Sequence, residues 1–334
     1  MKKSIFLFFA LVAGAINLFA DECVKTPTTL KGTASVIFTR YEHKNLTGAF
    51  AVSNSGDDTT YVAFSQGNLQ YQASTDTWRF AEHQYDTVGL NNKKISSTYR
   101  GWIDLFGYGT SGASEVNGGS ATSYQPWSVS DNDADYAVGG NSAADLNGSY
   151  AEADWAYHNA IINGGLDADG GVAHTWRVLK RAEWTYLFET RINATDLYGF
   201  GSLMGVNGLF LLPDGFSWTD ATVAAAALAY GGFTFTAGTG AYTSNVIDKS
   251  AAGAALWDAM ENKGVVFLPV TGRRNGSSMG ADGYGMYWSS THQAEIRAWI
   301  LRFGSNVLNY PDDNSSKQSR HYGFAVRPVH VLGE

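Results

Sequence analysis

Hydrogen-bonding side chains gather near the C-terminus, in a polar segment that runs from Asn306 to His321 and holds one proline. Amide, carboxylate and hydroxyl groups there offer donors and acceptors with little apolar area to bury, and tyrosines add contact area at a low entropic cost. Such chemistry favours recognition of a ligand, although an ordinary solvated hairpin loop has the same composition. The predicted ligand-binding residues are Asn309, Tyr310, Asp312, Asp313, Asn314, Ser315, His321 and Tyr322.

The sequence gives less support for catalysis or metal binding than for ligand recognition. Cys23 is the single cysteine, and no two of the seven histidines stand at the short spacings of common metal motifs. Asp131, Asp133 and Asp135 alternate as in a calcium loop, but Tyr136 stands where an EF-hand needs glycine and no Glu closes the loop. We therefore expect no metal, no cofactor and no catalytic residue.

Three further polar or aromatic residues have a structural interpretation. Glu183 and Asp214 would suit glycoside hydrolysis only if they faced each other across roughly 5–10 Å, which nothing in the sequence indicates. Glu183 is instead expected to be a structural or surface acid on a short amphipathic helix. Arg327 stands in an apolar run, so we expect it to form an ion pair or to bind carbonyl groups. Trp288 is expected in the core.

Aromatic and β-branched residues flank the polar segment on both sides, which predicts that a sheet holds it. The run 297–303 alternates between two unlike faces, as in a half-covered antiparallel sheet. Helices are predicted over 152–162, over 181–190 and from the N-cap Ser250 to Gly264. Residues 107–148 are rich in loop-forming types. Further strands are predicted at 50–52, 61–64, 69–72, 77–81, 265–269, 286–289 and 324–329.

The first twenty residues have the layout of a secretory leader, because Lys2 and Lys3 precede an apolar run that ends at Ala20. Lipidation of Cys23 is not expected, since Asp21 and Glu22 precede it. No other stretch approaches the roughly 20 apolar residues needed to span a bilayer. The sequence predicts a signal peptide over 1–20, an arm or edge strand over 21–45 and one α+β domain over 46–334. The expected location is secreted, periplasmic or on the cell surface.

The composition narrows the classes of partner. The net charge is −8 and the chain has no basic cluster beyond short pairs such as Arg273-Arg274, so nucleic acid is not an expected partner. With one cysteine, the chain has no internal disulfide and depends on its core. Aromatic residues make up 14% of the sequence, which suits large buried rings.

Five motifs in order resemble the Fibrobacter succinogenes major paralogous domain, a group of exported bacterial domains. The resemblance implies a C-type lectin-like fold, with short antiparallel sheets, two or three helices and long irregular loops, related to formylglycine-generating (sulfatase-modifying) enzymes. In this family Leu179 and Lys180 would often be Pro and a capping Thr, which leaves the start of the second helix in doubt. The motifs are Trp176-Arg177-Val178-Leu179 followed by Glu183-Trp184, Gly208 to Asp214, Gly264 to Pro269, Tyr287-Trp288-Ser289-Ser290, and Gly323 to Val329.

The resemblance also bears on function. Formylglycine-generating enzymes act through active-site cysteines, which a chain whose single cysteine is Cys23 does not supply. Gln125-Pro126-Trp127 lacks the acid of a calcium-dependent sugar site, and no Trp-Asn-Asp occurs. Targets of diversity-generating retroelements share this fold and vary Asn, Tyr, Asp and Ser codons in a C-terminal position like that of the polar segment.

We therefore expect a secreted or surface-exposed, non-catalytic protein that binds a protein or glycan ligand through its polar C-terminal segment. Two alternatives stay open. The chain is a structural subunit of a surface assembly, or it is an enzyme of unknown reaction on a formylglycine-generating-enzyme-like fold without its cysteines.

Overall fold

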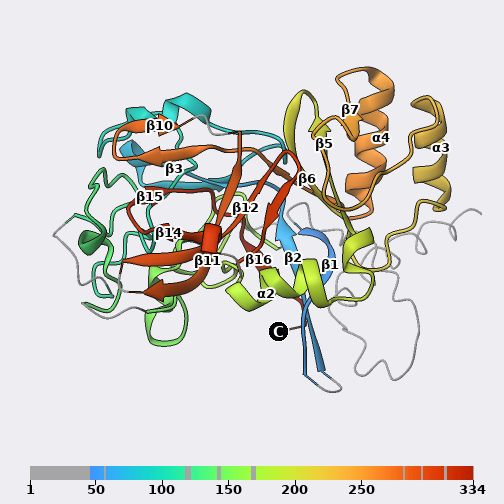
Figure 1. The fold of residues 1–334 in the computed structure, drawn as a ribbon. Helices are drawn as coiled ribbons and strands as arrows, with labels where there is room; N and C mark the ends of the chain where they lie inside the picture. Colours follow the sequence, from blue (N-terminus) through green and yellow to red (C-terminus); the bar gives the residue numbers. More distant parts are fainter. Residues whose placement is uncertain are drawn as a thin grey trace, which may run out of the picture.

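The computed structural model describes residues 46–55, 58–116, 122–140, 144–166, 171–280, 283–294, 296–311 and 314–333. The expected signal peptide and N-terminal arm lie outside these ranges. The described part is α+β, with many short, mostly antiparallel strands and few helices (Figure 1). Its longest helix, α4 (Ala251–Asn262), has 12 residues. None of the helices in these ranges has the length and hydropathy to cross a membrane.

A four-stranded antiparallel sheet carries the C-terminal polar segment. Its strand β12 (Arg297–Gly304) pairs with β11 (Gly285–Ala294), and also with β13 (Val307–Asn309) and β14 (Lys317–Ser319). The chain from β13 to β14 thus leaves β12 and returns to it. Both faces of β12 are buried, because Trp299 and Leu301 on one face are 7% and 0% exposed and Ile300 on the other is 0% exposed. The expectation of a half-covered sheet is wrong here, since the protein packs core on each side.

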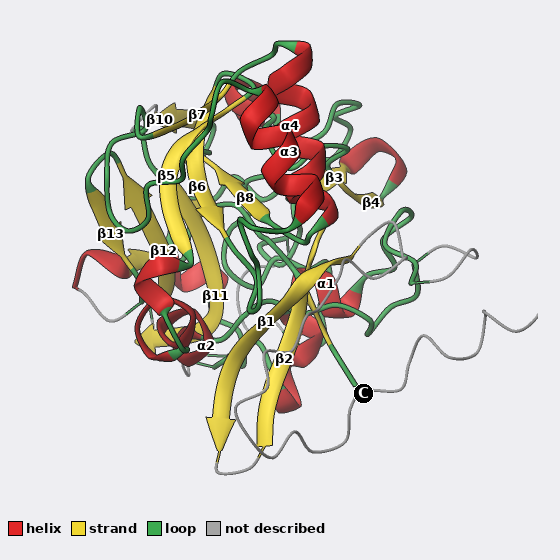
Figure 2. Ribbon diagram, turned by 90° about the vertical axis from the view of Figure 1, so that its right-hand side faces the viewer, coloured by secondary structure: helices red, strands yellow, loops and turns green. Residues whose placement is uncertain are grey.

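A second sheet has the order β7 (Asn245–Ile247), β5 (Tyr198–Leu203), β6 (Val206–Leu211) and β8 (Val266–Pro269), with β5 and β7 parallel. Helix α4 packs on it together with α3 (Ala221–Ala229) (Figure 2). The predicted third helix is confirmed, because the Ser250 side chain accepts the Gly253 N–H at 3.1 Å and Gly264 follows with φ +84°. Helix α3 was not predicted, since its alanine-rich sequence has helix propensity but no polar and apolar periodicity.

Strands β1 (Leu46–Ser55) and β2 (Asp58–Ser65) form a long hairpin that projects from the body (Figure 1). Strand β16 (Val329–Val331) pairs with the other edge of β2. The predicted strand over 324–329 is largely replaced by single bridges, one between Phe106 and Phe324 and one between Tyr287 and Ala325. Two small sheets complete the set: β3 (Leu69–Gln72) with β4 (Thr77–Phe80), and β10 (Ser278–Gly280), β9 (Arg273–Asn275) and β15 (Tyr322–Gly323).

The predicted helix over 152–162 is wrong. Only α1 (Trp155–His158) forms, after the 3-10 turn η4 (Gly148–Ala153), and Asn159 is already extended. The Asn159 side chain donates to the Trp155 carbonyl at 2.9 Å and so takes the place of a backbone N–H in the next turn. The other 3-10 turns are η1 (Ala73–Thr75), η2 (Gly89–Lys94), η3 (Asp133–Tyr136), η6 (Ala194–Asp196) and η7 (Asn314–Ser316).

The predicted helix over 181–190 is confirmed as α2 (Arg181–Thr185), which continues as the π-helical turn η5 (Tyr186–Thr190). Its start shows how the missing capping residue is replaced. The Lys180 N–H donates to the Glu183 carboxylate at 2.7 Å, and the Arg181 N–H donates to Thr291 Oγ1 of β11 at 3.0 Å. Thr291 thus satisfies the N–H of the first helical residue, whereas a Thr at position 180 would accept the N–H of the second or third.

Fully buried arginines organise the irregular connections. Arg274 donates to the carbonyls of Leu105, Ser128 and Gly276 at 2.9–3.3 Å. Arg327 is 1% exposed, and its main partner is Gln84 Oε1 at 2.6 Å. Its partners among the described residues are amide and carbonyl oxygens, so of the two expected roles the structure selects the second. Burial lowers the pKa of both guanidinium groups to about 10.

Strands β5 and β7 approach each other closely at Gly201, and a substitution there tests whether this close approach is required. A Cβ added there would lie 1.9 Å from the Asn245 carbonyl oxygen, so Gly201→Ala must push the two strands apart. We expect the free energy of unfolding to fall by about 3 kcal/mol. Urea denaturation measures it, with Ser202→Ala as the neighbouring control. Equal stability of the two variants would contradict this close approach.

Two buried carboxyl groups, Asp104 and Asp154, are expected to make stability depend on pH. Burial raises the pKa of each from 3.8 to about 6, against backbone and side-chain donors that lower it. The folded protein thus holds these protons more tightly than the unfolded chain. The stability they contribute is fully present below about pH 4 and is lost as the pH rises through 6.

Carboxyl ¹³C shifts followed from pH 3 to 8 should give midpoints near 6 for both groups, assigned with the Asn variants. Asp220 is the internal control, because its hydrogen bond with Lys263 lowers its pKa below 3.8. A midpoint near 4 for Asp154 would contradict the expected rise in its pKa, because its N–H donors would then cancel the effect of burial.

Candidate functional site

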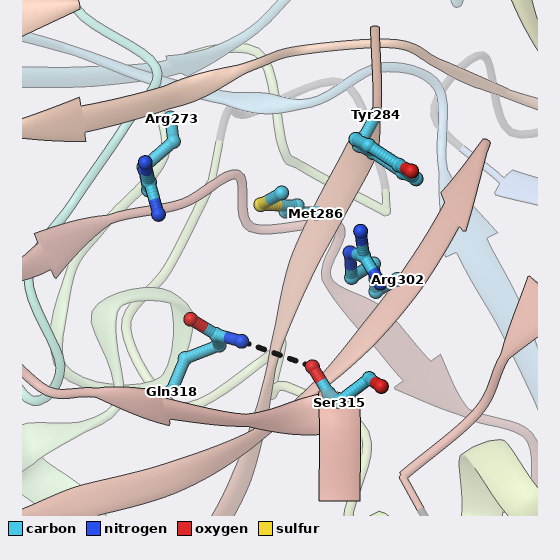
Figure 3. Close-up of a pocket in the computed structure, with 6 residues that line it drawn as sticks. All are labelled: Arg273, Tyr284, Met286, Arg302, Ser315 and Gln318. Atoms are coloured by element: carbon cyan, nitrogen blue, oxygen red, sulfur yellow. Dashed lines mark hydrogen bonds between the residues drawn. The ribbon is translucent and has the colours of Figure 1, made fainter. Parts of the chain in front are cut away.

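An open pocket of about 460 Å³ lies beside the C-terminal polar segment (Figure 3). Strands β9, β11, β12 and β14, the turn η7 and the residue before β11 each contribute a side chain. Elements of two different sheets therefore line one pocket. The lining residues are Arg273, Tyr284, Met286, Arg302, Ser315 and Gln318.

Arg302 is the best-defined cation of the pocket. It stands on β12 opposite Met286 of β11 and opposite Asn309 of β13. Its guanidinium carbon lies 3.9 Å from the centre of the Tyr284 ring, and Nη1 donates to Asn309 Oδ1 at 3.3 Å. The ring and the amide hold the guanidinium in place, while its remaining N–H groups can donate to a ligand.

Arg273 owes its position to its neighbour. Side chains alternate along β9, and Arg274 points into the core where it binds three carbonyl groups. Arg273 therefore lies on the other face, with its guanidinium 4.7 Å from the centre of the Tyr322 ring. The short basic pair seen in the sequence thus divides into one structural arginine and one that lines the pocket.

The rest of the pocket is apolar or neutral. Met286 is 4% exposed. The Gln318 side chain donates to the Ser315 carbonyl at 2.9 Å and ties β14 to η7 (Figure 3). Two guanidinium groups and no carboxylate stand among the six lining side chains. The charge of Arg302 and its fork of guanidinium donors favour an anionic group, such as a carboxylate or sulfate.

The predicted ligand-binding residues do not form one patch. Ser315 lines the pocket, whereas Asn309 and Tyr322 lie behind it and support its arginines. Tyr310 is turned toward the helix, because its hydroxyl donates to Glu189 Oε1 and its ring stacks on Phe188. The predicted segment is thus in part a support for the pocket.

The remaining predicted residues have other partners. His321 Nδ1 lies 2.8 Å from Asp133 Oδ1, so it links β15 to the loop that was compared with a calcium site. Asn314 Oδ1 accepts from the Lys317 ammonium at 2.8 Å. Asp312 and Asp313 lie outside the described residues.

Glu183 and Asp214, the two acids considered for catalysis, both have structural partners. Glu183 forms a bidentate ion pair with Arg177, with both N–O distances 2.7 Å, so the ion pair joins the segment before α2 to the first turn of that helix. Asp214 accepts the Ala51 N–H and lies 3.6 Å from Arg191. Within the ranges that the structure describes, no group of three or more His, Cys, Asp or Glu residues is arranged to hold a metal ion.

Sequence reasoning missed most of the pocket. Arg302 left a signal, since it is the one charged residue in the alternating core of β12. Arg273, Tyr284 and Gln318 left none, because nothing in the sequence brings β9, β11 and β14 together.

Comparisons with known proteins do not assign the chain to a family. No family model, no curated protein and no solved structure matches the chain.

Proposed function

We propose that this chain is a secreted or surface-exposed, non-catalytic binding protein with a C-type lectin-like fold of the Fibrobacter succinogenes major paralogous domain kind. The leader at 1–20 supports export, and the five ordered motifs support the fold. One observation carries the binding role: the Arg302 guanidinium, stacked on Tyr284, faces an open pocket beside the C-terminal segment. The ligand is a glycan or protein that presents an anionic group.

Prearrangement of Arg302 supports this role. A free arginine loses side-chain entropy when it binds an anion, but the contacts with Tyr284 and Asn309 restrict this one beforehand. The pocket is also open, which suits a group at the end of a larger partner.

The kinds of side chain in the pocket favour binding over catalysis. The six lining residues bring no carboxylate, imidazole or thiol, which are the usual general bases and strong nucleophiles. Ser315 supplies a hydroxyl, but a serine nucleophile needs an adjacent base.

An array of neutral, uronic-acid and sulfated glycans, with acidic and neutral peptides, tests the proposal. We expect binding to anionic members, and Arg302→Met should weaken it about 10- to 100-fold through loss of charged hydrogen bonds. Arg297→Met is the matched control, because Arg297 is an exposed arginine on the same strand. Unchanged binding by Arg302→Met, or an equal loss in both variants, would refute the site.

Assembly is the second candidate function, and the exposed face of α3 favours it. Leu228 is 76% exposed, and its neighbours on the helix surface are mainly alanines. A second copy of the chain would cover this apolar face. Sedimentation of the mature protein should then show an oligomer that Leu228→Asp disrupts, whereas a monomer at every concentration would count against assembly.

A further inference from the structure

A groove of about 660 Å³ lies between the β1–β2 hairpin and the segment that leads into α2. Its lining is separate from the pocket of Figure 3, with which it shares no residue. We propose that this groove is a second binding site, for a carboxylate-bearing ligand with neighbouring hydroxyl groups, such as a uronic acid. The side chains that carry the argument are Ser53, Thr60, Tyr157, His174, Lys180 and His330.

Lys180 supplies the positive charge. It occupies the N-cap position of α2, where a lysine cannot accept an N–H and where its charge opposes the helix dipole. Glu183 and Thr291 accept the N–H groups of Lys180 and Arg181, and the second and third helical N–H groups have no N-cap side chain to bind. The described residues give Lys180 no ion pair, whereas Arg177 and Glu183 neutralise each other. A residue that is locally unfavourable thus presents a net positive charge to the groove.

His174 is the second locally unfavourable residue. Its φ of +68° lies in the left-handed region that a histidine adopts at a conformational cost. The His174 N–H donates to the Tyr157 carbonyl at 2.7 Å, and the centres of the His174 and Tyr157 rings lie 4.5 Å apart. His174 Nε2 also lies 3.1 Å from Glu152 Oε1. These contacts hold the ring pair on the groove wall. Two locally unfavourable residues that line the same groove indicate a functional site.

The hairpin residues Ser53 and Thr60, together with His330, can bind the hydroxyl groups of the ligand. Ser53 and Thr60 face each other in the hairpin register, next to a shift in the pairing between Ala51 and Ser53. His330 Nδ1 lies 2.9 Å from the Thr175 carbonyl, which only accepts, so Nδ1 carries a hydrogen and, in the neutral ring, Nε2 is an acceptor. One cation, one nitrogen acceptor and two hydroxyls match a carboxylate with adjacent hydroxyl groups.

Titration with D-glucuronate and with D-glucose, followed by NMR of the full mature chain, tests the groove. Glucuronate should shift the signals of Lys180 and His330 and bind at least about tenfold more tightly than glucose, which lacks the charge. Lys180→Ser should remove that preference and also raise Tm by about 2–4 °C, because Ser accepts a helix N–H. Lys249→Ser, an exposed lysine beside the N-cap of α4, should change neither property.

A gain in stability with a loss of binding distinguishes a ligand residue from a structural one. The proposal is overturned if glucose binds as well as glucuronate, if Lys180→Ser binds glucuronate unchanged, or if that variant loses stability together with binding. Arg302→Met should leave glucuronate binding in this groove unchanged. The groove and the pocket at Arg302 are thus tested independently of each other. His174→Gly, which relieves the left-handed backbone, should again raise Tm and weaken binding.

Discussion

Backbone carbonyl groups inside irregular connections must find donors within the protein, and buried arginines provide them here. Arg191, Arg274, Arg320 and Arg327 are at most 2% exposed, and each donates to carbonyl or amide oxygens from separate stretches of chain. A guanidinium has five N–H donors and so can join several strands at one point. Desolvation of the charge is the cost, as the lowered pKa values of three of them show.

The candidate pocket depends on this arrangement. Arg274 fixes β9, and thereby the strand face on which Arg273 stands. Arg320 lies between β14 and β15 and donates to the Ala294 carbonyl, so it holds the return of the polar segment against the end of β11. The polar side chains at the pocket are therefore held by strands and loops that the buried arginines fix in position.

Much of the secondary structure could be predicted, for physical reasons that differ by element. Strands β1 to β4, β8, β11 and β12 have runs of β-branched and aromatic residues, and α4 has a cap, an apolar face and a terminating glycine. Helix α3 lacks periodicity, and α1 is cut short by one asparagine side chain, which no local pattern reveals. The pocket was predicted only at Ser315, because its two arginines stand on β9 and β12, which belong to different sheets, and no local sequence pattern shows that these sheets meet. The groove was visible only as one apparent misfit, Lys180 in a capping position.

The sheet of β1, β2 and β16 has a mechanical consequence. Both outer strands run antiparallel to β2, so they run parallel to each other and hold opposite ends of the described chain (Figure 1). Tension applied between those ends would load the two edges of β2 in shear, with many hydrogen bonds strained together rather than opened one by one. His330 lies on β16 and Thr60 on β2, so a pull on the chain would act directly across the groove walls.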